Sequence, residues 1–154
     1  MIEIKTETVI NTNVEHVWRA LTSIGSFQNW NRFMTSVIGD LHVGSQLTVT
    51  IVPPGSQPST FTPTVVKLDA KEHEFRWVGI LLFERLFRGE HYFQLIAIDE
   101  NTTRLIHGEQ FTGLFSPLIL WLIKDATLAG FQLMNQCLGV EAVRIASPLS
   151  RGIR

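Results

Sequence analysis

A series of short alternating segments that ends in a single long helical pattern limits most strongly what this chain can fold into. Between residues 34 and 113, apolar and polar residues alternate, and Gly, Pro, Asn and Asp interrupt the alternation, as expected for half-buried strands joined by turns. The pattern predicts strands at residues 34–41, 46–52, 61–69, 74–82, 88–98 and 102–112. Because short turns connect them, these strands should form an antiparallel meander.

The residues before this series predict one more strand and two short helices. Residues 2–10 alternate like a half-buried strand. The following Thr12-Asn-Val-Glu15 matches the capping box that begins many helices, and an apolar face then extends to Leu21. Residues 26–30 are expected to form a second, very short helix.

The long helical pattern follows Ser116-Pro117, where Ser suits the capping position and Pro suits the first helical position. Apolar residues then recur every three or four positions as far as Ala142, and the helix must end before Pro148. We predict one α+β domain over residues 1–146, with this helix covering the sheet, and a flexible tail at residues 147–154.

Composition excludes several classes of protein. Of the 154 residues, 45% are hydrophobic and 18% are charged, which is far from the composition of a disordered chain. The 13 Lys and Arg residues balance 14 Asp and Glu residues, so no basic excess is available to bind nucleic acid. One Cys allows neither an internal disulfide nor a multi-cysteine zinc site. The chain has no G-x-S-x-G, CxxC or HExxH motif, and we predict no cofactor.

The sequence predicts a cytoplasmic protein without stable membrane insertion. Residues 1–12 lack the basic start and continuous apolar stretch of a signal peptide. The longest apolar run, at residues 118–123, is far shorter than the roughly 20 residues that span a bilayer.

A set of segments in a fixed order resembles a known family. The segments are VWRAL at 17–21, WN at 30–31, FRWVG at 75–79, GEHYFQL at 89–95, TRLIHGEQFTG at 103–113 and GFQLMN at 130–135. Together they resemble the START/SRPBCC superfamily, most closely its polyketide cyclase/dehydrase-like branch, over about residues 3–144. The resemblance implies a helix-grip fold, in which a seven-stranded antiparallel sheet wraps around the long C-terminal helix. It also implies an apolar cavity that handles hydrophobic ligands, but members range from carriers to cyclases.

Three polar residues are predicted on the inner face of the last two strands. The apolar positions of both strands are mostly odd-numbered, which places His91, His107 and Glu109 on the face toward the long helix. If residues 99–101 form a three-residue hairpin loop with Asn101 in the left-handed region, His91 lies directly opposite Glu109. We therefore expect these two side chains to interact inside the cavity.

Several interpretations of these residues remain open. They could anchor a ligand or act as an acid/base pair in an apolar pocket. They could equally form an internally satisfied pair that fixes strand register. A two-His-one-carboxylate iron site has the same composition, but the family resemblance gives it no support, and we predict no metal.

The function predicted first is binding of a hydrophobic small molecule, such as a lipid-like, polyketide or aromatic compound, in the cavity between the sheet and the long helix. The alternative is a polyketide cyclase/dehydratase-like enzyme, in which His91, His107 and Glu109 would act as the catalytic acid/base residues. The sequence does not decide between the two. The predicted ligand-binding residues are Trp30, Phe75, Trp77, His91, Phe93, Leu105, His107, Glu109, Phe111, Phe131 and Met134.

An unusually apolar turn lies between two of the predicted strands. Residues 80–83 and 86–87 are apolar and flank Glu84-Arg85, although turns are ordinarily polar. We interpret them as a lip at the cavity entrance. Together with the apolar residues 118–123, they also suggest a modest homodimer interface.

Overall fold

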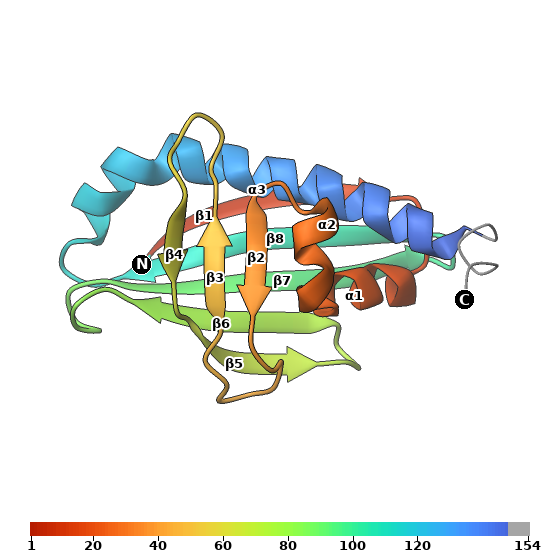
Figure 1. Cartoon of the computed structure of the whole chain (residues 1–154), viewed down its shortest axis with the longest axis horizontal. Helices are drawn as coiled ribbons and strands as arrows, with labels where there is room; N and C mark the ends of the chain where they lie inside the picture. The colour runs from red at the N-terminus through yellow and green to blue at the C-terminus, as the bar shows by residue number, and fades with distance from the viewer. Residues whose placement is uncertain (148–154) are drawn as a thin grey trace.

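The computed structural model describes residues 1–147 of the chain, and two antiparallel sheets enclose a long helix in it (Figure 1). Strands β1, β8, β7, β6 and β5 form a five-stranded sheet in that order, and β2, β3 and β4 form a three-stranded sheet. A single bridge between Gln46 and Thr64 links the two sheets. The elements in chain order are β1 (Ile2–Ile10), α1 (Val14–Thr22), a 3-10 turn (Ile24–Ser26), α2 (Phe27–Trp30), β2 (Met34–Ile38), β3 (Thr48–Ile51), β4 (Ser59–Phe61), β5 (Thr64–Asp69), β6 (Glu74–Ile80), β7 (Arg88–Asp99), β8 (Thr102–Thr112) and α3 (Ser116–Ala146).

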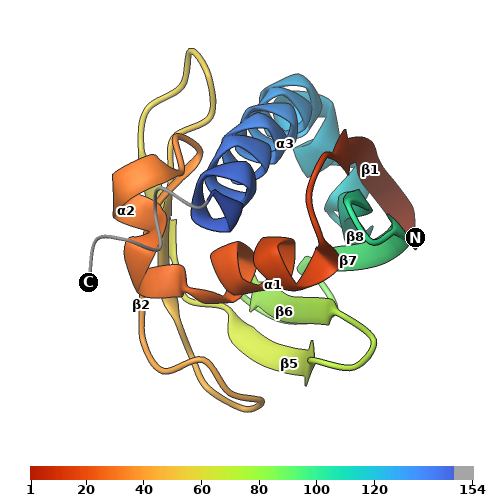
Figure 2. The same ribbon diagram turned by 90° about the vertical axis from the view of Figure 1, so that its right-hand side faces the viewer.

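The predicted α+β helix-grip fold is confirmed, but the prediction of one seven-stranded sheet is wrong in its strand count. The described residues contain eight strands in two sheets, because the segment predicted at 61–69 divides into β4 and β5. Pro63 lies between them, and a proline cannot donate a ladder hydrogen bond within a sheet. Figure 2 shows α3 held between the two sheets, with α1 packed below it.

Both predicted helix caps differ from the observed ones. Asn13, not Thr12, caps α1, since its side chain accepts a hydrogen bond from the Glu15 amide at 2.9 Å. Thr12 Oγ1 instead lies 3.1 Å from Nδ1 of His16. Phe115 occupies the N-cap position of α3 and Ser116 already belongs to the helix, with Pro117 in its first turn. The predicted end before Pro148 is confirmed at Ala146. Of the predicted tail, residues 148–154 lie outside the described part of the chain.

The β7–β8 register places His91 opposite Glu109, as predicted, although the loop that sets it is different. Asp99 pairs with Thr102, so the turn consists of Glu100 and Asn101, and Asn101 does not adopt the positive φ that we expected. A bulge between Ala97 and Asp99 absorbs one residue. The bulge restores odd-to-odd pairing, so both strands keep their apolar face toward α3.

The two halves of α3 differ in burial. The C-terminal half buries one side against the sheets, through Gly130, Phe131, Met134, Leu138 and Ala142 among others. The N-terminal half is apolar but largely exposed, with Leu118, Trp121 and Leu122 open to solvent. By length and mean hydropathy alone α3 could cross a membrane, but in this fold it is the central helix that the sheets enclose.

A glycine in α3 allows the three-stranded sheet to approach the helix closely. A Cβ atom on Gly130 would collide with the ring of Phe33, which lies directly before β2. Phe33 also packs edge-on against Phe131, with 6.0 Å between the ring centres. The small residue therefore brings the β2 end of one sheet against the same helix turn that carries Phe131.

Candidate functional site

A cavity of about 280 Å³ lies between α3 and the two sheets. Its walls come from β2, β3 and β4, from β6, β7 and β8, and from α3. Most lining side chains are apolar, among them Phe33, Met34, Ile51, Phe61, Phe111 and Phe131. The lining residues with ionisable side chains are His91 and Glu109. An apolar hollow with a few polar groups at one point is the usual form of a small-molecule site.

His91 and Glu109 form the polar wall of this cavity. His91 Nδ1 lies 3.5 Å from Glu109 Oε2, and only 3% of His91 is exposed. The imidazole is surrounded by aromatic rings, with Trp77 at 5.3 Å and Phe131 at 5.0 Å between ring centres. The Glu109 side chain keeps 22% of its surface exposed. The carboxylate therefore reaches the cavity, while the imidazole lies behind it among the rings.

His107 lies deeper, behind His91. The Nε2 atoms of the two histidines are 2.7 Å apart. His107 is completely buried between two rings, with 4.4 Å to the centre of Phe93 and 4.3 Å to that of Phe131. Burial is the main cause that holds the pKa of His107 well below 6.5, and the positive charge of His91 acts in the same direction. The Asn135 amide and the Phe131 carbonyl act against this shift. His107 is therefore a neutral imidazole at ordinary pH.

Asn135 and Thr6 continue the hydrogen-bonded series away from the cavity. Asn135 Oδ1 lies 2.7 Å from His107 Nδ1, and Asn135 Nδ2 donates to Thr6 Oγ1 at 2.8 Å. The Thr6 hydroxyl donates in turn to the His107 carbonyl at 2.9 Å. All of these groups are buried. We call the residues Thr6, Asn135, His107 and His91 the inner relay.

The sequence predicted part of the inner relay. His91 lies against Glu109, and His107 lies on the same inner face, as expected. The contact between the two histidines was not predicted, and Thr6 and Asn135 were not identified as site residues. Thr6 lies opposite His107 in the β1–β8 pairing, on the face opposite to the exposed Glu3 and Lys5. The alternation of β1 could have placed Thr6 on the inner face, but nothing local predicts its partner across 129 residues.

The predicted ligand-binding residues divide into two groups. Those that line the cavity are Trp77, His91, Glu109, Phe111 and Phe131. The others do not line it, and most are buried in the core around the inner relay, namely Phe75, Phe93, Leu105, His107 and Met134. Trp30 also lies away from the lining and donates a hydrogen bond to Ser26. The wall formed by β2 and β3, with Met34 and Ile51, was not predicted.

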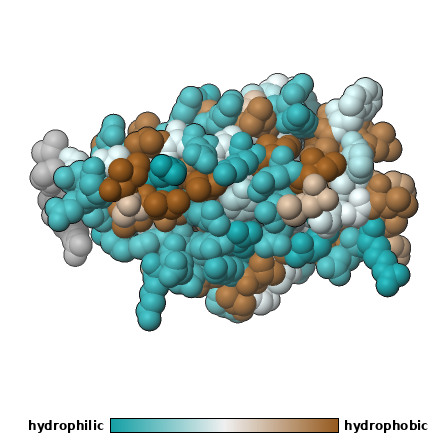
Figure 3. All heavy atoms as spheres, turned by 180° about the vertical axis from the view of Figure 1, so that it is seen from behind, coloured by the Kyte–Doolittle hydropathy of each residue, from teal (hydrophilic) through white to brown (hydrophobic). Residues whose placement is uncertain are grey.

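The predicted apolar lip lies at the edge of this cavity. Ile80, Leu81 and Phe87 line the cavity from the β6–β7 connection, and Ile123 lines it from α3. Backbone hydrogen bonds from Leu114 and Phe115 to Arg85 and Leu86 fasten this connection to the start of α3. Figure 3 shows apolar side chains gathered at the end of the molecule where the two segments meet. The exposed members of this apolar rim are Ile80, Leu81, Leu82, Phe83, Leu114, Phe115, Leu118, Trp121, Leu122 and Ile123.

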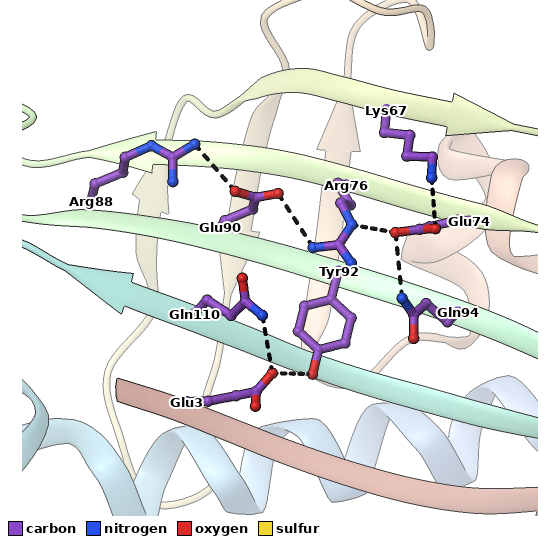
Figure 4. Close-up of polar contacts among 9 residues, drawn as sticks. All are labelled: Glu3, Lys67, Glu74, Arg76, Arg88, Glu90, Tyr92, Gln94 and Gln110. Carbon is purple, nitrogen blue, oxygen red and sulfur yellow. Dashed lines mark hydrogen bonds and ion pairs between the residues drawn. The ribbon is translucent and has the colours of Figure 1, made fainter. Parts of the chain in front are cut away.

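The opposite face of the five-stranded sheet carries a second polar group of residues, which we call the outer network (Figure 4). Arg76 pairs with both Glu74 and Glu90, Arg88 pairs with Glu90, and Lys67 pairs with Glu74. Tyr92 donates to Glu3, which also accepts from Gln110. These residues point away from α3 and none of them lines the cavity.

The geometry does not favour the iron-site alternative. Both ring nitrogens of His107 and one of His91 are engaged in hydrogen bonds within the inner relay. Among residues 1–147, no group of three or more His, Cys, Asp or Glu side chains is arranged to hold a metal ion. The same three residues are better described as a hydrogen-bonded series that ends at the cavity.

Comparison with known proteins agrees with this architecture. The family model described as "Polyketide cyclase / dehydrase and lipid transport" matches residues 1–140. No curated protein sequence gives a match. Norcoclaurine synthase from Thalictrum flavum, in complex with dopamine and hydroxybenzaldehyde, superposes with a TM-score of 0.72 at 12% identity, covering 95% of this chain and 88% of that one.

Two further structures are similar to the same extent. The Zhui aromatase/cyclase from Streptomyces sp. R1128 has a TM-score of 0.73 at 11% identity, with 96% of this chain and 97% of that chain covered. A protein from Thermus thermophilus has a TM-score of 0.74 at 15% identity, with 95% and 100% covered. At such identities the structures show a shared fold. With a family model that matches nearly its whole length, the chain belongs to the polyketide cyclase/dehydrase and lipid transport family, within the START/SRPBCC superfamily of helix-grip proteins.

Proposed function

We propose that this protein binds a hydrophobic small molecule, such as an aromatic, polyketide or lipid-like compound, in the cavity between α3 and the two sheets. The observation that carries the proposal is the cavity itself, about 280 Å³ with mostly apolar walls and one ionisable pair. Burial of apolar ligand surface contributes about 25 cal/mol per Å². His91 and Glu109 would then fix the orientation of the bound molecule.

The family and its neighbours support a ligand of this kind. The description of the matching family names polyketide cyclases, dehydrases and lipid transport. The Thalictrum flavum synthase was determined with two small aromatic compounds, and the Streptomyces protein is an aromatase/cyclase. The cavity volume of about 280 Å³ lies just below the roughly 300–1,000 Å³ that is usual for small-molecule pockets. This favours a compact aromatic ligand over a long lipid chain.

A second candidate function is acid/base catalysis on a polyketide-like substrate, as in a cyclase or dehydratase. The contact between His91 and Glu109 on the cavity wall favours it, because a paired imidazole and carboxylate can exchange a proton with a bound molecule. His107 has no free ring nitrogen, so its part would be to orient His91. An enzyme should lose turnover in His91→Ala and Glu109→Ala while it keeps much of its affinity. A carrier has no turnover to lose.

Native mass spectrometry of the purified protein tests the proposal, with identification of any molecule released on denaturation. A matched variant is Thr127→Phe, because Thr127 lines the cavity from α3 and a larger side chain there would fill it. We expect a bound apolar compound with the native protein and none with the variant. The proposal fails if the native protein binds no aromatic or lipid-like compound from a screened set, or if Thr127→Phe binds as well as the native protein.

We also propose a modest homodimer contact through the apolar rim. Trp121 is 78% exposed and Phe83 is 70% exposed, and large exposed apolar patches commonly mark interaction sites. Light scattering over a range of concentrations should show self-association that Trp121→Glu removes. A monomer at all concentrations would contradict the dimer, without bearing on the cavity.

A further inference from the structure

The hydrogen bonds of the inner relay have only one consistent direction. The carbonyl of His107 can only accept, so the Thr6 hydroxyl must donate to it. The oxygen of Thr6 then accepts from Asn135 Nδ2, which fixes the amide with Oδ1 toward His107. Because Oδ1 is an acceptor, Nδ1 of His107 must carry a hydrogen. The His107 carbonyl thus determines the tautomer of the His107 imidazole through the side chains of Thr6 and Asn135.

The direction of the hydrogen bond at His91 follows from the tautomer of His107. A neutral His107 that is protonated at Nδ1 has a lone pair at Nε2, and burial between two rings keeps it neutral. The Nε2 atom of His91, 2.7 Å away, must therefore be the donor of that hydrogen bond. The remaining ring nitrogen of His91 is Nδ1, which faces Glu109 Oε2 at 3.5 Å.

A glycine makes room for the carboxylate. Gly89 lies on β7, and a Cβ atom there would be 2.5 Å from Oε1 of Glu109. Its φ is not in the left-handed region, so the backbone itself would accept another residue. Within residues 1–147, the carboxylate of Glu109 has no hydrogen bond of its own besides the contact with His91. It therefore retains acceptor capacity toward the cavity.

Resting on the function proposed above, we infer that the cavity selects aromatic compounds that carry a phenolic or enolic hydroxyl, which donates a hydrogen bond to the Glu109 carboxylate. Thr6, Asn135 and His107 are positioning residues, because they keep the Nε2 hydrogen of His91 turned away from the cavity. Gly89 is also a positioning residue, because the absence of a Cβ atom there leaves room for the Glu109 carboxylate at the cavity wall.

Matched naphthalene probes test this inference. 2-Naphthol has a hydroxyl donor, whereas 2-methoxynaphthalene has a similar shape and can only accept. A hydrogen bond to a charged group implies a preference of about tenfold or more for 2-naphthol in calorimetric or fluorescence titrations. Glu109→Gln and Gly89→Ala should reduce this preference to about onefold to threefold. Glu90→Gln, the same exchange on the outer face, should leave the preference unchanged.

The outcomes separate this inference from the proposed function. Equal affinity for both probes, or an unchanged preference in Gly89→Ala and Glu109→Gln, would overturn the inference while an apolar binding cavity remains. Failure of both probes and of naphthalene itself to bind would instead count against the cavity as a ligand site.

Nitrogen-15 NMR of the imidazoles gives a readout that does not depend on any ligand. We expect His107 to be protonated at Nδ1 and unprotonated at Nε2, and His91 to be protonated at Nε2. Asn135→Leu should abolish the fixed tautomer of His107, and Gln110→Leu, an amide on the outer face, should not. A His107 that carries its proton at Nε2 in the native protein would contradict the whole assignment.

Discussion

The two faces of the five-stranded sheet carry different kinds of polar groups. On the outer face, full charges lie side by side, as in the contacts of Arg88 with Glu90 at 3.2 Å and of Lys67 with Glu74 at 2.8 Å. On the inner face, the relay uses neutral amide, hydroxyl and imidazole groups until it reaches His91 and Glu109 at the cavity. Full charges on the outer face therefore lie near water, whereas on the inner face the carboxylate of Glu109 lies at the cavity and the groups behind His91 are neutral.

Loss of a hydrogen-bond or ion-pair partner should cost more stability on the inner face than on the outer face. The charged groups of the outer network keep some contact with solvent, and water can replace a missing partner there. The inner groups are buried, so the loss of one partner leaves another polar group unsatisfied. Substitutions on the inner face should therefore change both the polar wall of the cavity and the free energy of unfolding. Substitutions on the outer face should leave the cavity unchanged.

The largest effect on stability is expected for Asn135→Leu. The substitution removes the acceptor of the His107 Nδ1 hydrogen and the donor to Thr6. The buried Nδ1 of His107 then lacks an acceptor and Thr6 Oγ1 keeps only its bond to the His107 carbonyl, which should lower the free energy of unfolding by about 2–4 kcal/mol. Urea unfolding of the native protein and the variant measures this change in the free energy of unfolding. The matched outer change Gln110→Leu should cost less than about 0.5 kcal/mol, and equal costs for the two variants would remove the distinction between the faces.

A pH dependence of the same free energy should come next in size. The folded-state pKa of His107 lies well below 6.5, whereas the unfolded-state value is about 6.5. Below that pH the unfolded chain binds more protons, so stability is complete above pH 6.5 and is lost as the pH falls, at up to about 1.4 kcal/mol per pH unit.

His107→Gln is the variant that isolates this contribution. It should flatten the slope between about pH 6.5 and 5 in urea unfolding. Glu74 and Asp69, whose pKa values are lowered from 4.5 and 3.8, begin to matter only below this window. An unchanged slope in His107→Gln would show that His107 is not held neutral in the folded protein.

The smallest effect is expected from the outer face. Glu90→Gln removes pairs with Arg76 at 3.3 Å and with Arg88 at 3.2 Å. Because these charges are partly solvated, the free energy of unfolding should fall by about 1 kcal/mol or less, and by less again at high salt. Unfolding at low and high ionic strength checks this. A cost as large as that of Asn135→Leu would mean that the outer network also acts as a desolvated unit.

The sequence predicted the position of the polar wall better than the loop that creates it. His91 faces Glu109 because the apolar alternation requires both strands to turn their odd positions inward. The bulge at Ile98 corrects a turn of different length, and no local signal in the sequence indicates it. The apolar alternation was sufficient because burial of one face constrains the register more strongly than the turn does.

Other parts of the site depend on tertiary structure that alternation does not encode. Asn135 meets His107 only because α3 has one particular rotation against β8 and β1. The wall of Met34 and Ile51 exists because β2, β3 and β4 form a separate sheet across the helix. The role of Gly89 becomes visible only when the Glu109 carboxylate is seen to lie over it.

The most direct test of this account is a crystal structure of the protein with 2-naphthol. The account predicts the naphthalene rings in the cavity against Trp77, Phe111 and Phe131, with the hydroxyl within hydrogen-bond distance of the Glu109 carboxylate. A naphthol molecule bound at the apolar rim outside the cavity, or a cavity closed by its own aromatic side chains, would contradict it.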